Sequence, residues 1–374
     1  MMKKLRIGID ATALPPNLSG AGKYIFQLIL NLSKIDTENE YFIFTNSRIF
    51  FSKIKNPNFR FQEFNFTSRL KRILWEQNSL PKFTKELKLD ILHSPHYTFP
   101  LKKLSCKKVV TIHDLTFFLF PTLHLKSKRI FFQKFTELAT KKADKILTVS
   151  ENTKKDLVRF FPKSASKTVS TSLGIGEHFK IGSKNLEFLK KNDLSENYLL
   201  CVGTIEPRKN VETLLLAYKN LLEQKKIYEK LVLVGQFGWK YEKVKSLLKE
   251  PLLTKNVKHF GFVNETDLVK FYQNAKAVIY PSIYEGFGFP PLEALACGKP
   301  VFSGNNSAIE ENVRDLALLL DCGKVAEVEN GIIEILQNEN WKQIAEDSAE
   351  RIDKDFSWQR TAEKTLEVYR SVTL

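Results

Sequence analysis

The chain has 374 residues and a formal net charge of +16 at pH 7. Apolar residues make up 43% of it and charged residues 27%, which excludes a disordered or collagen-like protein. Residues 1–180 hold 32 basic and 14 acidic side chains, whereas residues 181–374 are close to neutral. The first half is therefore expected to face an anionic partner: a nucleic acid, a phospholipid or a phosphorylated substrate.

Cysteine spacing and hydropathy favour a cytoplasmic protein. The four cysteines lie far apart without metal-binding spacing, which indicates a reducing compartment. Asp10 interrupts the first apolar stretch early, so we expect no signal peptide. No uncharged apolar run approaches the roughly 18 residues of a spanning helix, and we expect a soluble or at most peripheral protein.

The first half alternates short apolar runs with helical patterns. Residues 5–10 form an apolar run, and apolar side chains over 21–32 follow helical spacing. By the same criteria we expect strands at 41–45, 89–93, 108–113 and 145–150, and helices near 67–88, 123–142 and 151–161.

The second half repeats this alternation, with strands expected at 198–203, 230–235, 276–282 and 316–321 and a helix over 212–222. Apolar strands between helices imply parallel sheets covered on both faces. Glycines and polar residues over 173–185 mark a break between domains. We therefore predict an α/β protein of two doubly wound, Rossmann-like domains, 1–180 and 181–356, facing each other across a cleft.

The sequence YEGFGFPPLEALACGKP (284–300) is the most informative stretch. Gly286, Phe287 and Gly288 form a loop between an expected strand and a helix that begins at two prolines, and such a loop offers amides to an anion. Glu285 and Glu293 flank this loop, and carboxylates are suited to binding sugar or ribose hydroxyls. Either acid alone is also explained as a solvated loop residue or a favourable charge near a helix N-terminus.

Other strand ends offer further candidates. Arg208 and Lys209 in GTIEPRKN follow an expected strand, where cations are able to bind phosphate, although such a pair is also common in solvated turns. Gly20 and Gly22 in SGAGKY allow a backbone to approach phosphate, but a plain turn explains them as well. His113 in TIHDL is either a proton-exchanging site residue or a structural histidine.

Taken in order, these pieces resemble glycosyltransferase family 4, a group of retaining enzymes with the GT-B fold. Glu285 and Glu293 are similar to its E-x7-E motif, and SGAGKY, RLKRILWEQNSLP (69–81), HSPHYTFP, VVTIHDL and GTIEPRKN follow in family order. The resemblance spans nearly the whole chain and is closest to the mannosyltransferase-like branch. It also implies that the C-terminal helix 357–374 completes the first domain.

The resemblance implies transfer of a sugar from a nucleoside diphosphate donor to a hydroxyl, with no metal and no other cofactor. Glu293 would hold the ribose, Glu285 the donor sugar, and the amides of Phe287 and Gly288 the sugar and diphosphate. Lys209 would neutralise the leaving diphosphate.

In the first domain, His113 would lie near the reacting sugar, and Gly20 and Gly22 beside the phosphates. One position departs from the family: Thr204 stands where many members have an arginine, and Arg208 is the candidate to replace its charge.

We therefore expect a hexosyltransferase that moves mannose from GDP-mannose to a lipid-linked or cell-surface glycan at the cytoplasmic membrane face. A UDP-sugar donor is the alternative within this chemistry. The basic-aromatic stretches 68–75 and 126–135 suit an anionic bilayer, or else pack inside with solvated lysines around them. A non-enzymatic nucleic-acid binder is the alternative from another class, supported by net charge alone.

Overall fold

The computed structural model describes residues 3–373 and divides the chain into two compact units. The first unit runs to Gly174 and resumes at Ser357, and the second is Ile175–Phe356. The first boundary lies a few residues before the expected break after residue 180. At this boundary the amide of Ile175 donates to the carbonyl of Phe356 at 2.8 Å, which joins the first and last residues of the second unit.

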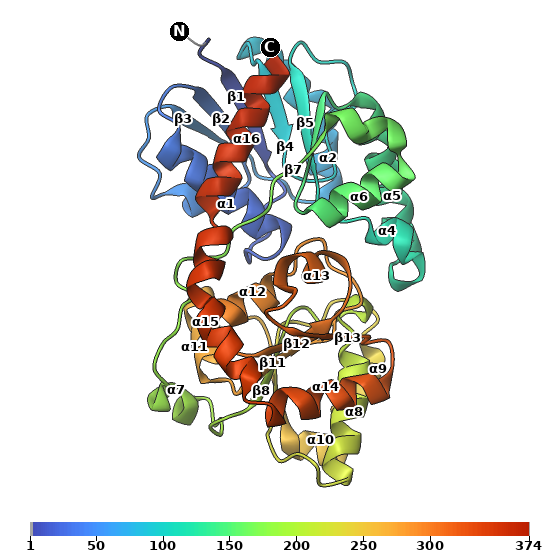
Figure 1. Cartoon of the computed structure of the whole chain (residues 1–374). Helices are drawn as coiled ribbons and strands as arrows, with labels where there is room; N and C mark the ends of the chain where they lie inside the picture. The colour runs from blue at the N-terminus through green and yellow to red at the C-terminus, as the bar shows by residue number, and fades with distance from the viewer. Residues whose placement is uncertain (1–2, 374) are drawn as a thin grey trace. The chain divides into compact units, whose positions relative to one another are not determined.

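The first unit contains a seven-stranded parallel sheet with the order β3-β2-β1-β4-β5-β6-β7 (Figure 1). Its strands are β1 (Arg6–Ala11), β2 (Glu40–Thr45), β3 (Phe59–Glu63), β4 (Ile91–Ser94), β5 (Lys107–Ile112), β6 (Lys145–Thr148) and β7 (Thr168–Ser170). The strand order changes direction between β1 and β4. In doubly wound sheets, ligands bind outside the carboxyl ends of the strands at this switch point.

Helices cover both faces of this sheet. They are α1 (Ala21–Ile35), α2 (Arg69–Asn78), α3 (Leu80–Glu86), α4 (Thr116–Leu119), α5 (Lys126–Lys142), α6 (Glu151–Phe160) and α16 (Trp358–Thr373). The C-terminal helix α16 belongs to this unit and packs beside α1 (Figure 1). One apolar core includes Ile112, Phe135 and Leu157, and a second includes Phe44 and Leu80.

A buried chain of hydrogen bonds links α16 to the sheet. The hydroxyl of Tyr369 lies 2.6 Å from Nδ1 of His93, and Nε2 of His93 lies 2.8 Å from Oγ1 of Thr111. Thr111 Oγ1 in turn lies 3.1 Å from the hydroxyl of Tyr24 on α1. Burial, together with the neighbouring His96, lowers the pKa of His93 to about 3, so its imidazole is neutral in the folded protein.

Because His93 is neutral in the folded protein, the free energy of unfolding should depend on pH. In the unfolded chain, His93 binds a proton below about pH 6.5, whereas in the folded chain it does so only near pH 3. The contribution of His93 to the free energy of unfolding is therefore complete above about pH 6.5, and it decreases as the pH is lowered. Between pH 7 and pH 5 the wild type should lose about 2 kcal/mol more than His93→Gln. Urea unfolding at both pH values measures this difference, and the exposed His178→Gln is the control that should keep the wild-type loss.

The second unit repeats the topology with a six-stranded parallel sheet in the order β10-β9-β8-β11-β12-β13. Its strands are β8 (Leu199–Val202), β9 (Leu231–Val234), β10 (Val257–Phe260), β11 (Ala277–Tyr280), β12 (Val301–Gly304) and β13 (Leu318–Leu320). The switch point lies between β8 and β11. The two-sheet architecture confirms the predicted fold class, because each unit is a doubly wound α/β domain.

The helices of the second unit are α7 (Leu186–Lys191), α8 (Val211–Glu223), α9 (Glu242–Leu247), α10 (Pro251–Asn256), α11 (Glu265–Asn274), α12 (Phe289–Ala296), α13 (Ser307–Val313), α14 (Val325–Gln337) and α15 (Asn340–Asp355). Leu214, Tyr218 and Leu221 of α8 are buried in the core, as their helical spacing predicts. Helix α12 has prolines in its first turn and is followed by Gly298 with φ of 66°.

Four strands were missed by the sequence patterns: β3, β7, β10 and β12. The first three are edge strands, and β3 and β10 are only partly buried, so they lack the continuous apolar runs that predict buried strands. β12 is central and buried, but only its first two residues, Val301 and Phe302, form an apolar run. None of the helices in the described part of the chain has the length and apolar character that crossing a bilayer requires.

Candidate active site

In the second unit, polar side chains gather where β8 and β11 end, at the switch point of the sheet. The loop after β8 contains one 3-10 turn, Pro207–Lys209, and then Asn210 in the left-handed conformation (φ 56°) before α8 begins. The amide of Ile283, after β11, donates to the carbonyl of Arg208 at 2.9 Å. The two loops are thus joined, and side chains that are distant in sequence meet at one edge.

The carboxylate of Glu285 is the centre of this site. Its Oε1 lies 2.5 Å from the ammonium of Lys209, and its Oε2 lies 2.5 Å from Nη1 of Arg208. The hydroxyls of Tyr280 and Ser282 also donate to Oε1, at 2.8 and 2.6 Å. The structure therefore places two predicted site residues, Arg208 and Lys209, beside the carboxylate of a third, Glu285, which is 7% exposed.

Charge determines how these groups ionise. Burial alone would raise the pKa of Glu285, but the positive charges of Arg208 and Lys209 lower it to about 2. Burial lowers the pKa of Lys209, and Glu285 opposes that effect. Glu206 accepts from Arg208 at 2.9 Å, and burial raises its pKa. The cluster thus holds two cations balanced by two carboxylates, and an incoming diphosphate would compete with Glu285 for both cations.

The loop between Glu285 and α12 has the geometry expected of an anion site. Gly288 has φ of 86°, a conformation that favours glycine, and a Cβ there would make a tight contact of 3.1 Å with the side chain of Ile309. Gly286 and Phe287 before it are buried, and Asn312 fixes the carbonyl of Phe287 through a bond of 2.6 Å. Among the described residues, no hydrogen bond uses the amides of Phe287 or Gly288.

Glu293 lies on α12 and is also buried, at 4% exposure. The hydroxyl of Tyr272 on α11 donates to its Oε2 at 3.0 Å. Burial and the charge of Glu293 raise the pKa of Tyr272 well above its usual value, so Tyr272 remains a donor. Glu293 therefore has Tyr272 as a hydrogen-bond donor of its own.

The position where many family members have an arginine holds the uncharged Thr204. Arg208 supplies a guanidinium to the same loop and fixes it by donating to the carbonyl of Tyr284 at 2.8 Å as well as to Glu285. Its replacement of the missing arginine in donor binding stays a prediction.

In the first unit, His113 follows β5 at the carboxyl edge of the sheet. Its Nε2 lies 3.0 Å from the carbonyl oxygen of Pro95. A carbonyl only accepts, so Nε2 bears the proton and Nδ1 is the acceptor. Burial lowers the pKa of His113, and its ring packs edge-on against Tyr24 at 5.3 Å. Nothing in the part of the chain that the structure describes donates to Nδ1 of His113, so this neutral histidine is suited to accept a hydrogen bond from a hydroxyl.

Gly20 precedes α1 and Gly22 lies in its first turn, and a different physical reason favours glycine at each position. Gly20 has φ of 49°, and nothing lies within 4 Å of a Cβ placed there, so its backbone conformation requires glycine and its surroundings are open. A Cβ on Gly22 would lie 2.5 Å from the ring of Pro15, so Gly22 has a packing reason. The open space beside Gly20 agrees with the close approach of a ligand to its backbone. A phosphate-binding role for Gly20 and Gly22 stays a prediction.

A buried polar cluster at the switch point of the first unit was missed by the sequence patterns. Arg72 on α2 lies 2.9 Å from Glu76, and both contact Thr98 at 3.0 and 2.6 Å. His96, after β4, lies 3.4 Å from Asp10 at the end of β1. Arg72 and Glu76 lie in the stretch 69–81 that resembles the family, and their i, i+4 spacing on a helix permits an ion pair, but nothing in the sequence links them to Asp10 or His96.

Asp10, Glu76 and His96 each offer a ligand atom within 4.8 Å of the others. Glu76, however, already accepts from Arg72 and Thr98 through one oxygen and from Gln77 through the other. A guanidinium thus supplies the positive charge that a buried pair of carboxylates needs. Burial alone would raise the pKa of Asp10, but the neighbouring His96 and Arg72 lower it to about 2.

Comparison with known proteins places both units in one family. Residues 184–354 match the model of glycosyl transferases group 1, and residues 18–175 match that of Glycosyltransferase Family 4. The chain is 32% identical over 289 residues to the O-antigen chain mannosyltransferase B of Escherichia coli, covering 76% of this chain and 75% of that protein.

Two further likenesses agree. The chain is 26% identical over 286 residues to the serotype-specific mannosyltransferase WbdA of E. coli; this covers 74% of the chain but about a third (35%) of that longer protein. The crystal structure of WaaG, a glycosyltransferase involved in lipopolysaccharide biosynthesis, has the same fold (TM-score 0.74, 17% identity, 97% of this chain and 99% of that chain). These findings decide against the non-enzymatic nucleic-acid binder: the chain is a glycosyltransferase of family 4, group 1, with the GT-B fold.

Proposed function

We propose that this glycosyltransferase moves mannose from GDP-mannose to a hydroxyl of a lipid-linked or cell-surface glycan, with retention at the anomeric carbon. The observation that supports this best is the buried Glu285 held between Arg208 and Lys209 at the switch point of the second unit. The choice of mannose rests on the relatives, because two of them are named as mannosyltransferases. A UDP-sugar donor is the alternative.

In this proposal the second unit binds the donor. Glu293 accepts from the ribose hydroxyls, and Glu285 accepts from hydroxyls of the sugar while it holds the two cations in place. Lys209 and Arg208 then neutralise the diphosphate, and the amides of Phe287 and Gly288 donate to it. Fixed cations and amides of this kind stabilise a leaving group without reorganising during the reaction.

The reaction breaks the bond between the anomeric carbon and the diphosphate oxygen, and the acceptor oxygen bonds to the same carbon on the same face. The acceptor's proton passes to the leaving phosphate, so the protein needs no general base. We expect the first unit to bind the acceptor at the carboxyl edge of its sheet, with Nδ1 of His113 available to accept from a sugar hydroxyl. The site as proposed uses no metal.

The experiment that tests the donor is a binding and transfer panel. GDP-mannose should raise the melting temperature of the protein, since a ligand that binds only the folded state stabilises it. UDP-glucose and UDP-galactose should not do so at the same concentration. Transfer of labelled mannose to a lipid extract then tests the reaction, and a melting temperature raised only by a UDP-sugar would replace the proposed donor with the alternative.

We also propose that α2 and α5 of the first unit contact an anionic membrane. Leu70 and Leu74 on α2 and Ile130 on α5 are 66%, 52% and 54% exposed among basic residues. The guanidinium of Arg69 lies over aromatic rings of α5, so the two helices are neighbours. Phe135 is buried in the core, which favours the packing alternative for that residue. Exposed apolar side chains among cations suit an interfacial site.

Vesicle flotation at low salt tests this contact. The wild type should float with phosphatidylglycerol vesicles and not with phosphatidylcholine vesicles. Leu70→Ser/Leu74→Ser should reduce the floated fraction at least about threefold, because the two exposed leucines would no longer insert into the bilayer. Ile49→Ser is the matched control, since Ile49 is 75% exposed on a different part of this unit. Equal flotation with both kinds of vesicle would contradict the proposal.

A further inference from the structure

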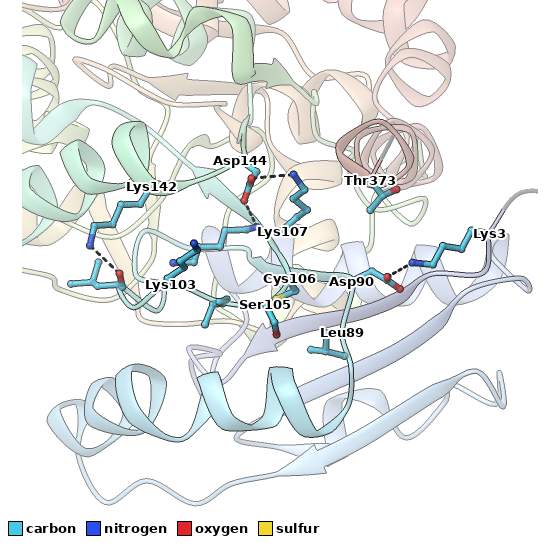
Figure 2. Close-up of a pocket in the computed structure, with 13 residues that line it drawn as sticks. Lys3, Leu89, Asp90, Lys103, Ser105, Cys106, Lys107, Lys142, Asp144 and Thr373 are labelled. Atoms are coloured by element: carbon cyan, nitrogen blue, oxygen red, sulfur yellow. Dashed lines mark hydrogen bonds and ion pairs between the residues drawn. The ribbon is translucent and has the colours of Figure 1, made fainter.

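The excess positive charge of the first half is not explained by the donor site, which lies in the second unit. Part of it lines a cavity of about 630 Å³ in the first unit. The cavity lies at the amino-terminal edge of the sheet: Lys3, Asp90, Lys107 and Asp144 lie before or at the start of β1, β4, β5 and β6 (Figure 2). This edge is opposite the one that bears His113 and the switch point, so the cavity is separate from the candidate active site.

Five lysines and two aspartates line this cavity: Lys3, Lys103, Lys107, Lys108 and Lys142, with Asp90 and Asp144. Both carboxylates already have partners within the protein. Asp90 pairs with Lys3 at 2.6 Å and accepts from the amide of Arg6, while Asp144 pairs with Lys107 at 3.6 Å and accepts from the amide of Lys108. Within residues 3–373, no carboxylate pairs with the other three ammonium groups.

Those three ammonium groups are those of Lys103, Lys108 and Lys142. Lys108 donates to the carbonyls of Pro100 and Lys102, and Lys142 donates to the carbonyl of Leu101 at 2.9 Å. Carbonyls satisfy hydrogen bonds without neutralising charge. Burial lowers the pKa of Lys108, and the charge of Lys142 lowers it further, which agrees with an unbalanced positive potential in the cavity. No bond or ion pair of the described residues engages the ammonium of Lys103.

We propose that this cavity binds a ligand bearing a phosphate or diphosphate group, at a site independent of sugar transfer. Its volume is that of a typical small-molecule site and is large enough for a phosphorylated metabolite or a phospholipid headgroup. The ammonium of Lys103 and the exposed face of Lys142 supply the charge-assisted hydrogen bonds that hold phosphate oxygens. Ser105 adds a hydroxyl donor to the same lining. The ligand brings the negative charge that the lysines lack.

Inorganic pyrophosphate is the probe for this site, with binding located by amide hydrogen exchange. The position of the bound pyrophosphate must be determined because pyrophosphate is also expected to bind at Arg208 and Lys209 in the second unit. Wild-type protein with pyrophosphate should show slower exchange over residues 101–108. Lys103→Gln/Lys142→Gln should weaken binding at this location about tenfold or more, while protection near Lys209 is unchanged.

The matched control is Lys53→Gln/Lys163→Gln, which removes two exposed charges of the same unit outside the cavity and should keep wild-type binding. Lys103→Gln alone is the second variant, since its side chain supports no bond in the fold, and it too should weaken protection. Monomeric dihexanoyl-phosphatidylglycerol distinguishes the source: protection by it indicates a lipid headgroup, and protection by pyrophosphate alone a soluble phosphate. No protection of 101–108 by either probe, or equal losses in the cavity and control variants, would overturn the proposal.

Discussion

Glu285→Gln is expected to reduce sugar transfer at least about 100-fold while leaving a folded protein. The substitution keeps the size of the side chain and removes its charge. Arg208 and Lys209 lose the carboxylate that orients them, and the donor sugar loses an ionised acceptor. Since the pKa of Glu285 is about 2, the wild-type group is ionised at every pH at which the assay is practical.

The same change should also lower the free energy of unfolding, by about 3 kcal/mol, because two buried cations are left with less compensation. Glu310→Gln is the matched control: Glu310 is an exposed carboxylate of this unit that pairs with Arg314, and its loss should cost less than about 1 kcal/mol and no activity. Urea unfolding and a labelled-donor assay on the same preparations separate the two effects. Wild-type transfer by a folded Glu285→Gln would show that the site is wrongly assigned.

Much of the second unit's site was predictable because its residues are close in sequence to recognisable strand ends. Glu285 and Glu293 flank one glycine loop, and Lys209 follows a buried strand by a few residues. Parallel strands place their carboxyl ends on one edge, so the meeting of these loops follows from the fold class. The fold class did not predict that Glu285 pairs with both Arg208 and Lys209, because this pairing depends on side-chain geometry across two loops.

The polar cluster of the first unit shows where such prediction ends. Asp10, Glu76 and His96 come from three separate segments, and each has an ordinary local explanation as a strand, helix or loop residue. They meet where Arg72 and Glu76 of α2 form hydrogen bonds with Thr12, after β1, and Thr98, after β4. Edge strands such as β3 were missed for a related reason: one face is solvated, so burial does not impose a continuous apolar run on their sequence.

The composition of the first half of the chain determines its net charge, but only the structure shows where the charged side chains lie. Net charge predicted an anionic partner without saying where it binds. The structure separates three locations: exposed cations around α2 and α5, the lysines of the cavity at the amino-terminal edge, and Lys209 with Arg208 in the near-neutral second unit. Charge balance distinguishes them, because Lys209 and Arg208 have carboxylate partners and Lys103 has none in the described chain.

Lys209→Met is expected to lower kcat about 10²- to 10³-fold, with a smaller change in KM for the donor. The reason is the place of its ammonium. Lys209 is held by Tyr280 and Glu285, each at 2.5 Å, so it is fixed before the donor arrives. A prepositioned cation stabilises charge that develops on the leaving diphosphate more than it stabilises the bound donor.

Steady-state kinetics with varied donor measure both parameters, and Lys243→Met is the control. Lys243 is an exposed lysine of the same unit that pairs with Glu212, and its replacement should change neither kcat nor KM. If Arg208 replaces the arginine absent at Thr204, Arg208→Met should also lower kcat, and the double variant should lose less than the product of the two single losses, because both cations contact one carboxylate. A change confined to KM would assign Lys209 to donor binding alone, and the leaving group would then require another cation of the second unit.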